Sequence, residues 1–171
     1  MVLGLLAPIA SWVRPECGFG TYARVDVAAL VNRELCGYEI KAHRDSLRRL
    51  QGLPAGMQVQ EFSRIFDRVV LVVAPKHLRR AALIVPEWWG LTVATESLEV
   101  FRPGEKNPGP ASERLARTLW VREARALASR LKVGRGLVHK GDLIRCLAGC
   151  PEEDLRAAVN AVLPVRQWVG T

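Results

Sequence analysis

The sequence lacks a long uninterrupted hydrophobic run. Its longest aliphatic stretch, Val69 to Ala74, is far shorter than the roughly 20 apolar residues that a membrane-spanning helix requires. The uncharged opening from Met1 to Val13 has the length of a signal peptide, but no basic segment precedes it and Pro8 interrupts it. We therefore expect a buried N-terminal helix, no signal peptide and no membrane partner.

Cysteine is also scarce. Four cysteines are too few for a disulfide scaffold in a chain of 171 residues, and no C-x-x-C pair is present to begin a zinc site. Cys146 and Cys150 lie four apart in a predicted helix without a third ligand nearby, so we interpret them as buried small side chains. This usage indicates a reducing compartment, and hence a cytoplasmic protein.

Apolar and basic residues, in contrast, are plentiful. Hydrophobic residues make up 49% of the chain and charged residues 25%, which is typical of a globular domain with a sizeable core and excludes wholesale disorder. The formal net charge is +8, and 20 of the 25 basic residues are arginine, the side chain suited to bidentate phosphate contacts. The composition therefore favours a polyanionic partner such as nucleic acid.

The order of the predicted elements indicates an α/β fold. Alternation of apolar and polar residues predicts a strand over Tyr22–Val31, and a hairpin-like connection near Asn32 leads to a second strand over Tyr38–Lys41. The run Val69–Ala74 has no polar alternation, which predicts a strand covered on both faces. Helical spacing predicts helices beginning near Asp45 and over 57–66, 77–85, 112–131, 140–147 and 152–163, and short edge strands are expected over 91–94 and 98–101.

A segment rich in proline and glycine divides the chain. Arg102 to Pro110 reads R-P-G-E-K-N-P-G-P, which can continue neither a helix nor a central strand. We therefore expect an α/β core in residues 1–101, a linker over 102–111 and a basic helical region over 112–171. That last region carries 11 basic and 6 acidic residues.

Three charged residues on the first two predicted strands form a candidate site. Glu39 and Lys41 share a face because strand side chains alternate, and Asp26 reaches the same face if the two strands are neighbours. Two carboxylates beside an ammonium group are typical of a Mg²⁺ site that hydrolyses phosphodiesters. The alternative is a solvated cross-strand ion pair, but the strands are otherwise strongly apolar, and buried charges are costly unless they are paired or bound to a metal.

The ordered motifs resemble a bacterial family of the PD-(D/E)XK nuclease superfamily. The similarity covers about residues 14–90 and is carried by the motifs R-V-D-V, G-Y-E-I-K, R-D-S-L-R-R-L, Q-V-Q-E-F, F-D-R-V-V-L-V-V-A-P-K-H-L and V-P-E-W-W-G. The resemblance implies a mixed sheet flanked by helices, as in restriction endonucleases, followed here by the small helical region.

The resemblance also implies roles for individual residues. Asp26 and Glu39 would hold Mg²⁺ or Mn²⁺, Lys41 would be the catalytic lysine, and Gln58 would correspond to the polar residue of the superfamily's Q-x-x-x-Y motif. Phe62 replaces the tyrosine of that motif. Glu16 is similar in position to the acidic metal ligand that the first helix of this fold often contributes. Superfamily members often dimerise to cut both strands, so the resemblance also allows a homodimer of this chain.

Two further basic groups are candidates for binding nucleic acid. Arg44, Arg48 and Arg49 follow the strand that carries Lys41 and can contact a backbone held over the metal, or else form an ordinary solvated face. The segment 131–148 resembles the helix-turn-helix of SAP-type nucleic-acid modules, in which Lys140 and Arg145 would meet phosphates. The alternative for this segment is a plain helical cap.

The preferred interpretation is a metal-dependent nuclease that acts on nucleic acid, with DNA preferred over RNA, in repair, restriction or defence against mobile elements. A catalytically inactive nucleic-acid-binding module on the same fold is the first alternative. A protein-interaction module, such as a toxin or phage component, is the second.

Overall fold

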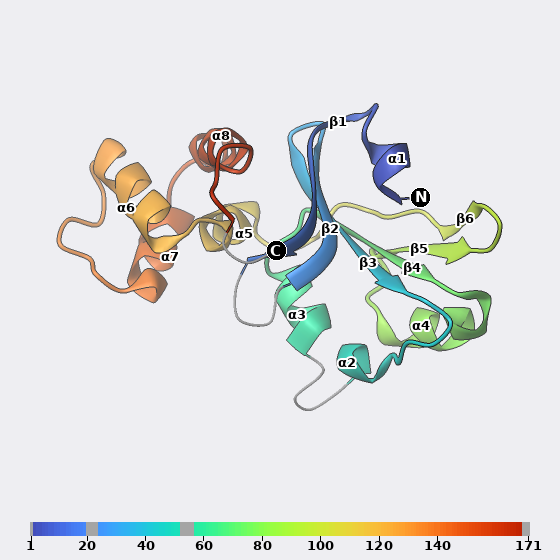
Figure 1. Ribbon diagram of the computed structural model, residues 1–171. Coiled ribbons are helices and arrows are strands. Elements are labelled where there is room, and N and C mark those ends of the chain that lie inside the picture. Colours follow the sequence, from blue (N-terminus) through green and yellow to red (C-terminus); the bar gives the residue numbers. More distant parts are fainter. Residues whose placement is uncertain (1, 20–23, 52–56, 169–171) are drawn as a thin grey trace. The chain divides into compact units, whose positions relative to one another are not determined.

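The computed structural model describes residues 2–19, 24–51 and 57–168, and the chain divides into two compact units, Met1–Pro108 and Gly109–Thr171 (Figure 1). The first contains a six-stranded sheet, and the second is helical. The protein is therefore a mixed α/β chain followed by a helical unit, as the order of predicted elements indicated. No helix in the described ranges is long and apolar enough to cross a bilayer.

The strands of the sheet lie in chain order, β1 to β6. Strands β1, β2 and β3 form an antiparallel meander, β3, β4 and β5 are parallel neighbours, and β6 returns antiparallel to β5. The sheet is therefore mixed. Its strands span Ala10–Gly18, Arg24–Val31, Glu34–Lys41, Arg68–Val73, Gly90–Ala94 and Leu98–Arg102.

A tight turn joins β2 to β3. Val31 pairs with Glu34, so Asn32 and Arg33 alone form the loop, and both have positive φ, 51° and 67°. Two successive residues with positive φ are typical of the type I′ turn, whose twist matches that of the flanking strands. The predicted hairpin is confirmed, and β3 begins four residues before the predicted strand.

Helices lie on both sides of the sheet (Figure 1). The parallel crossovers place α2 (Arg48–Gln51), α3 (Met57–Ser63), the 3₁₀ turn η1 (Pro75–His77) and α4 (Leu78–Ile84) on one side. The short α1 (Val2–Leu6) packs on the other side, where Val2 and Leu6 contact Val27, Ala29 and Val72. The aliphatic run of β4 is buried between these layers, apart from the partly exposed Arg68 and Val70.

The N-terminal segment differs from its prediction. Instead of one helix through Val13, the helix ends at Leu6 and β1 begins at Ala10. An apolar run without clear periodicity fits either a helix or a strand, and pairing with β2 decides for the strand because it satisfies the backbone hydrogen bonds of Ala10–Gly18. Glu16 consequently lies on a strand and not on a first helix.

An aromatic core fills the space between the sheet and α3. Phe62 and Phe66 pack edge to face, and Phe62 stacks on Trp89, whose side chain is fully buried. Phe66 also presses against Gly37 of β3, where an added Cβ would lie 2.9 Å from the ring carbon Cδ2. Only a residue without a side chain fits there.

Gly37→Ala is therefore expected to destabilise the fold by about 1–3 kcal/mol, because the buried Phe66 ring must move. Gly18→Ala is the matched control, since it is also a strand position but nothing lies within 4 Å of its added Cβ. Urea denaturation of the two variants measures the difference. Equal stability of the two variants would show that the Phe66 ring can move aside without loss of unfolding free energy.

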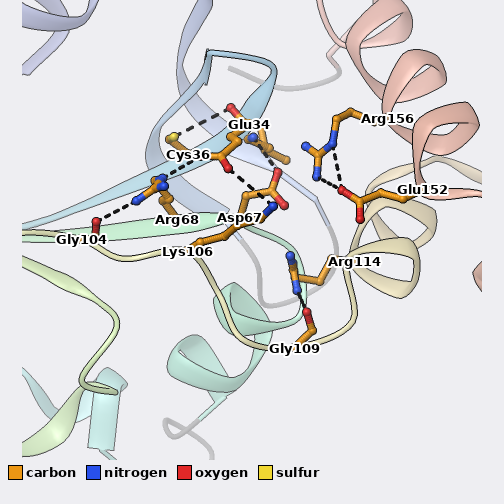
Figure 2. Close-up of polar contacts among 11 residues, drawn as sticks. Glu34, Cys36, Asp67, Arg68, Gly104, Lys106, Gly109, Arg114, Glu152 and Arg156 are labelled. Atoms are coloured by element: carbon orange, nitrogen blue, oxygen red, sulfur yellow. Dashed lines mark hydrogen bonds and ion pairs between the residues drawn. The ribbon is translucent and has the colours of Figure 1, made fainter.

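The segment after β6 packs against the sheet although its sequence predicted a linker. Arg68 donates to the Glu34 carboxylate at 2.7 Å and to the Gly104 carbonyl at 2.9 Å, as Figure 2 shows. The buried Asn107 donates from its side chain to the carbonyls of Ser63 and Phe66. Residues 104–107 therefore belong physically to the first unit.

The second unit consists of α5 (Ala111–Thr118), α6 (Val121–Arg130), α7 (Lys140–Ala148) and α8 (Glu152–Val162). The single helix predicted over 112–131 is broken at Leu119 and Trp120, both of which have extended backbone. The Glu123 carboxylate accepts the Trp120 backbone N–H at 2.7 Å and so caps a new helix. The prediction missed this because Trp120 is not a usual N-cap residue.

Glu123 also forms a buried ion pair in this unit. Its carboxylate oxygens accept from Arg166 Nε at 3.0 Å and from an Arg166 terminal nitrogen at 2.6 Å, and Arg166 also donates to the Thr118 carbonyl. The guanidinium carbon lies 4.8 Å from the ring centres of both Trp120 and Trp168. This cluster fixes the chain beyond α8 to the start of α6.

Candidate active site

Asp26 of β2 and Glu39 of β3 lie side by side across the hairpin. Val27 pairs with Tyr38, so Asp26 and Glu39 are the next residues in the antiparallel register. Asp26 Oδ2 accepts the backbone N–H of Ile40 at 2.6 Å. The carboxylate thus takes the place of a backbone acceptor where the two strands separate, and the hydrogen bond holds it against β3.

Glu39 is almost completely buried, with 3% of its surface exposed. Its Oε1 accepts from Lys41 Nζ at 2.5 Å and from Gln58 Nε2 at 3.3 Å. Its Oε2 has no hydrogen-bond partner among the described residues, and neither has the side-chain oxygen of Gln58. The predicted quartet of Asp26, Glu39, Lys41 and Gln58 is therefore brought together, with two buried oxygen atoms left unpaired.

Burial raises the pKa of both carboxyls. For Asp26, loss of water is the largest cause, which the Ile40 hydrogen bond and the Lys41 charge oppose. For Glu39, loss of water again raises the pKa most, Lys41 lowers it, and the charge of Asp26 raises it further. The charge of Asp26 thus makes ionisation of Glu39 less favourable, and an additional cation at this place would relieve the repulsion.

The atoms present suit a hard divalent cation. Carboxylate and amide oxygens are the ligands that Mg²⁺ and Mn²⁺ prefer, and the unpaired Glu39 Oε2 and Gln58 Oε1 are buried acceptors of this kind. Mg²⁺ usually needs only one or two carboxylates, because water completes its coordination. The described part of the chain holds no group of three or more Asp, Glu, His or Cys residues that could bind a metal, so water would have to complete the coordination of an ion held by Asp26 and Glu39.

Glu16 lies near this pair but its carboxylate is engaged elsewhere. The pairs Pro15 with Val27 and Cys17 with Val25 place Glu16 opposite Asp26. Its Oε2 accepts from Arg24 Nε at 2.8 Å in an exposed ion pair, and its φ of 53° marks a local irregularity in β1. Its charge contributes to the raised pKa of Asp26. Its predicted role as a metal ligand stays a prediction.

Two of the three arginines predicted to follow β3, Arg44 and Arg48, are exposed. Arg44 lies in the turn that follows Lys41, and Arg48 begins α2. Neither forms an ion pair within the described ranges. The backbone of Arg49 is helical, but its side chain lies outside the described residues. Arg44 and Arg48 therefore add free positive charge beside the end of β3, which is compatible with the predicted contacts to a nucleic-acid backbone.

Lys140 and Arg145, the predicted phosphate contacts of the second unit, are less available to a ligand than Arg44 and Arg48. Arg145 is exposed but forms an ion pair with Asp142, one turn away on α7. Lys140 is half-buried, and its pKa is lowered first by loss of water and then by the charge of Arg166. The freer cations lie on α6 and the loop after it, a group that the sequence interpretation did not select.

Comparison with known proteins gives few relatives. No curated protein matches the chain. A solved structure described as "SPO1766 protein of unknown function from Silicibacter pomeroyi" is 24% identical with a TM-score of 0.43, and the match covers 70% of this chain and 76% of that one. The family model described as "Bacteriophage P4 protein cII" matches residues 16–167, which is most of the chain, and the protein belongs to this family.

Proposed function

We propose that the first unit is a divalent-metal-dependent nuclease of the PD-(D/E)XK type that hydrolyses phosphodiester bonds in nucleic acid, with DNA as the expected substrate. The observation that carries the proposal is the buried Glu39 carboxylate, which lies beside Asp26 and keeps one oxygen unpaired. Lys41 offsets only one of the two neighbouring acidic charges, and the other costs free energy in this largely buried place unless a further cation joins it. Repair, restriction and defence against mobile elements are the settings in which this activity would serve.

The fold supports the finer assignment without being specific for it. The sheet is mixed and carries helices on both sides, and the acidic pair lies on the hairpin that leads into the parallel strands. The order Asp26, Glu39-x-Lys41 and then Gln58 on the next long helix follows the superfamily motif. Phe62 departs from it, since its buried ring packs in the aromatic core and supplies no hydroxyl.

The residues present would divide the work of hydrolysis. Asp26 and Glu39 would hold Mg²⁺ or Mn²⁺, which neutralises charge on the phosphoryl group. Lys41, already in contact with Glu39 Oε1, would donate a hydrogen bond to the attacking water or to the charged oxygen of the transition state. Gln58 would keep the Glu39 carboxylate oriented through the same oxygen.

Cleavage of plasmid and of single-stranded DNA and RNA in Mg²⁺ or Mn²⁺ tests the proposal. Asp26→Asn and Lys41→Met are each expected to lower the rate by about 10²–10³-fold or more, because each removes one charge from the site. Asp26→Asn keeps an acceptor for the Ile40 N–H, so the hairpin is preserved. Glu99→Gln, an exposed carboxylate on β6, is the matched control and should leave cleavage unchanged.

A binding module without turnover is the second candidate. It is favoured by the small number of carboxylates in the site and by the engagement of Glu16 with Arg24. Binding that weakens steeply with salt, together with no cleavage in either metal, would support this candidate against the nuclease. The absence of nucleic-acid affinity at low salt would instead favour a protein-interaction module.

A further inference from the structure

The unneutralised positive charge of the second unit gathers on α6 and the loop that follows it. In this unit, Glu113, Glu123, Asp142 and Glu152 each form an ion pair with an arginine. Arg125, Lys132 and Arg135 are exposed, and none of them forms an ion pair with a described acidic residue. The net positive charge of the second unit is therefore concentrated on α6 and the loop that follows it.

These three cations line one cavity. It has a volume of about 340 Å³, lies between the end of α6 and the start of α7, and has no acidic residue in its wall. Arg125 is held in place because one terminal nitrogen donates to the Val138 carbonyl at 2.7 Å, across the loop. The cavity is thus a preformed pocket with a positively charged rim, and it shares no residue with the acidic pair on β2 and β3.

The loop after α6 combines left-handed residues with unpaired backbone N–H groups. Lys132 has a positive φ of 57° because it ends α6, where its N–H and that of Val133 donate to the Ser129 and Ala128 carbonyls. Beyond it, Gly134 and Gly136 have positive φ of 62° and 77° on either side of Arg135, and a left-handed residue beside a right-handed one turns successive N–H groups toward one side, where they bind anions. The N–H groups of Gly134, Arg135 and Gly136 donate to no acceptor among the described residues.

We propose that this pocket, lined by Arg125, Lys132 and Arg135 and floored by the loop 132–137, binds a phosphate group of a nucleic-acid backbone. Guanidinium groups and free backbone N–H groups together suit a phosphate's several acceptor oxygens. The pocket extends the proposed function, since the same nucleic acid would be its ligand, but it involves no metal and none of the residues of the acidic site.

Binding of a fluorescently labelled DNA duplex, followed by anisotropy over a series of salt concentrations in EDTA, tests the pocket. Lys132→Ala/Arg135→Ala should weaken binding about tenfold or more at low salt and reduce the slope of log K against log salt by about 2, because two phosphate contacts are lost. Arg122→Ala/Arg130→Ala is the matched control, as it removes two exposed cations of the neighbouring α6 that line a different cavity. It should change the affinity less than about threefold.

Equal losses in the two double variants would overturn the proposal, because diffuse charge would then explain binding. An absence of binding by the wild type would overturn it as well. Competition with inorganic phosphate distinguishes the two sources of a phosphate group. If free phosphate displaces the labelled duplex at a concentration equal to that of the duplex phosphates, the pocket is a site for the free ion and not for the nucleic-acid backbone. A wild type that cleaves nucleic acid but does not bind the duplex in EDTA would remove only this proposal, and a wild type that binds through the pocket but cleaves in neither metal would remove only the nuclease.

Discussion

Glu123→Ala is expected to destabilise the second unit by about 3–5 kcal/mol, because it leaves the charge of Arg166 buried without its partner. The Arg166 side chain has no solvent exposure, so water cannot replace the two hydrogen bonds that it loses. The substitution also removes the acceptor for the Trp120 N–H at the start of α6. Guanidinium denaturation followed by tryptophan fluorescence measures the effect, since Trp120 and Trp168 flank Arg166.

Arg117→Ala is the control for this prediction. Arg117 pairs with Glu113 at i and i+4 on α5, where both side chains are partly exposed, and its loss should cost only about 0.3–0.5 kcal/mol. Arg166→Met/Glu123→Leu should cost much less than the sum of the single changes, because no charge is then stranded. A loss after Glu123→Ala as small as that after Arg117→Ala would show that the cluster contributes nothing beyond a surface ion pair.

Glu39→Gln is expected to have two opposite effects: higher stability at neutral pH and loss of the stabilisation that a divalent cation gives. Burial raises the pKa of Glu39 above its ordinary value of 4.5. Its contribution to stability is therefore fully present below pH 4.5 and is lost as the pH rises through the raised pKa. A neutral glutamine avoids this loss while it keeps a side-chain oxygen for Lys41.

The difference in unfolding free energy between Glu39→Gln and wild type should accordingly grow as the pH rises from 4.5 toward neutrality. Taking this difference cancels the contributions of ionisable groups that do not interact with Glu39. Saturating Mn²⁺, at about 100 times its Kd, should stabilise the wild type by about 2.7 kcal/mol and the variant much less. Glu99→Gln, whose carboxylate is exposed, should follow the wild type in both measurements. A variant that is less stable at every pH would contradict the prediction.

Local sequence signals predicted much of the fold. Alternation around Asp26 marked β2, the aliphatic run of β4 marked a buried strand, and the Asn32 turn marked the hairpin. The prediction of a single helix over the opening segment was wrong. An apolar run without periodicity fits a strand as well as a helix, and only pairing with β2 distinguishes the two. The helix break at Trp120 was not predicted, because the cap of the new helix comes from a glutamate three residues later.

The candidate site was predictable to the extent that its residues are close in sequence. Asp26, Glu39 and Lys41 lie on one hairpin, where strand alternation and register decide which side chains meet. The Glu123–Arg166 pair joins residues 43 positions apart, and no local sequence pattern predicts such a contact. The pocket around Arg135 was missed for another reason: its loop backbone depends on left-handed residues, and the sequence interpretation had given the positive charge to α7 instead.

The strand order bears on how the acidic pair is assembled during folding. Because every strand pairs with its neighbour in the chain, no loop in the sheet has to close over an intervening strand. Asp26 and Glu39 meet through the two-residue turn between β2 and β3, one of the shortest closures available to a chain, which carries little entropic cost. The two acids can thus be in register from the first hairpin onward, and the later docking of α3 and the parallel strands removes water from around them and brings Gln58 to Glu39.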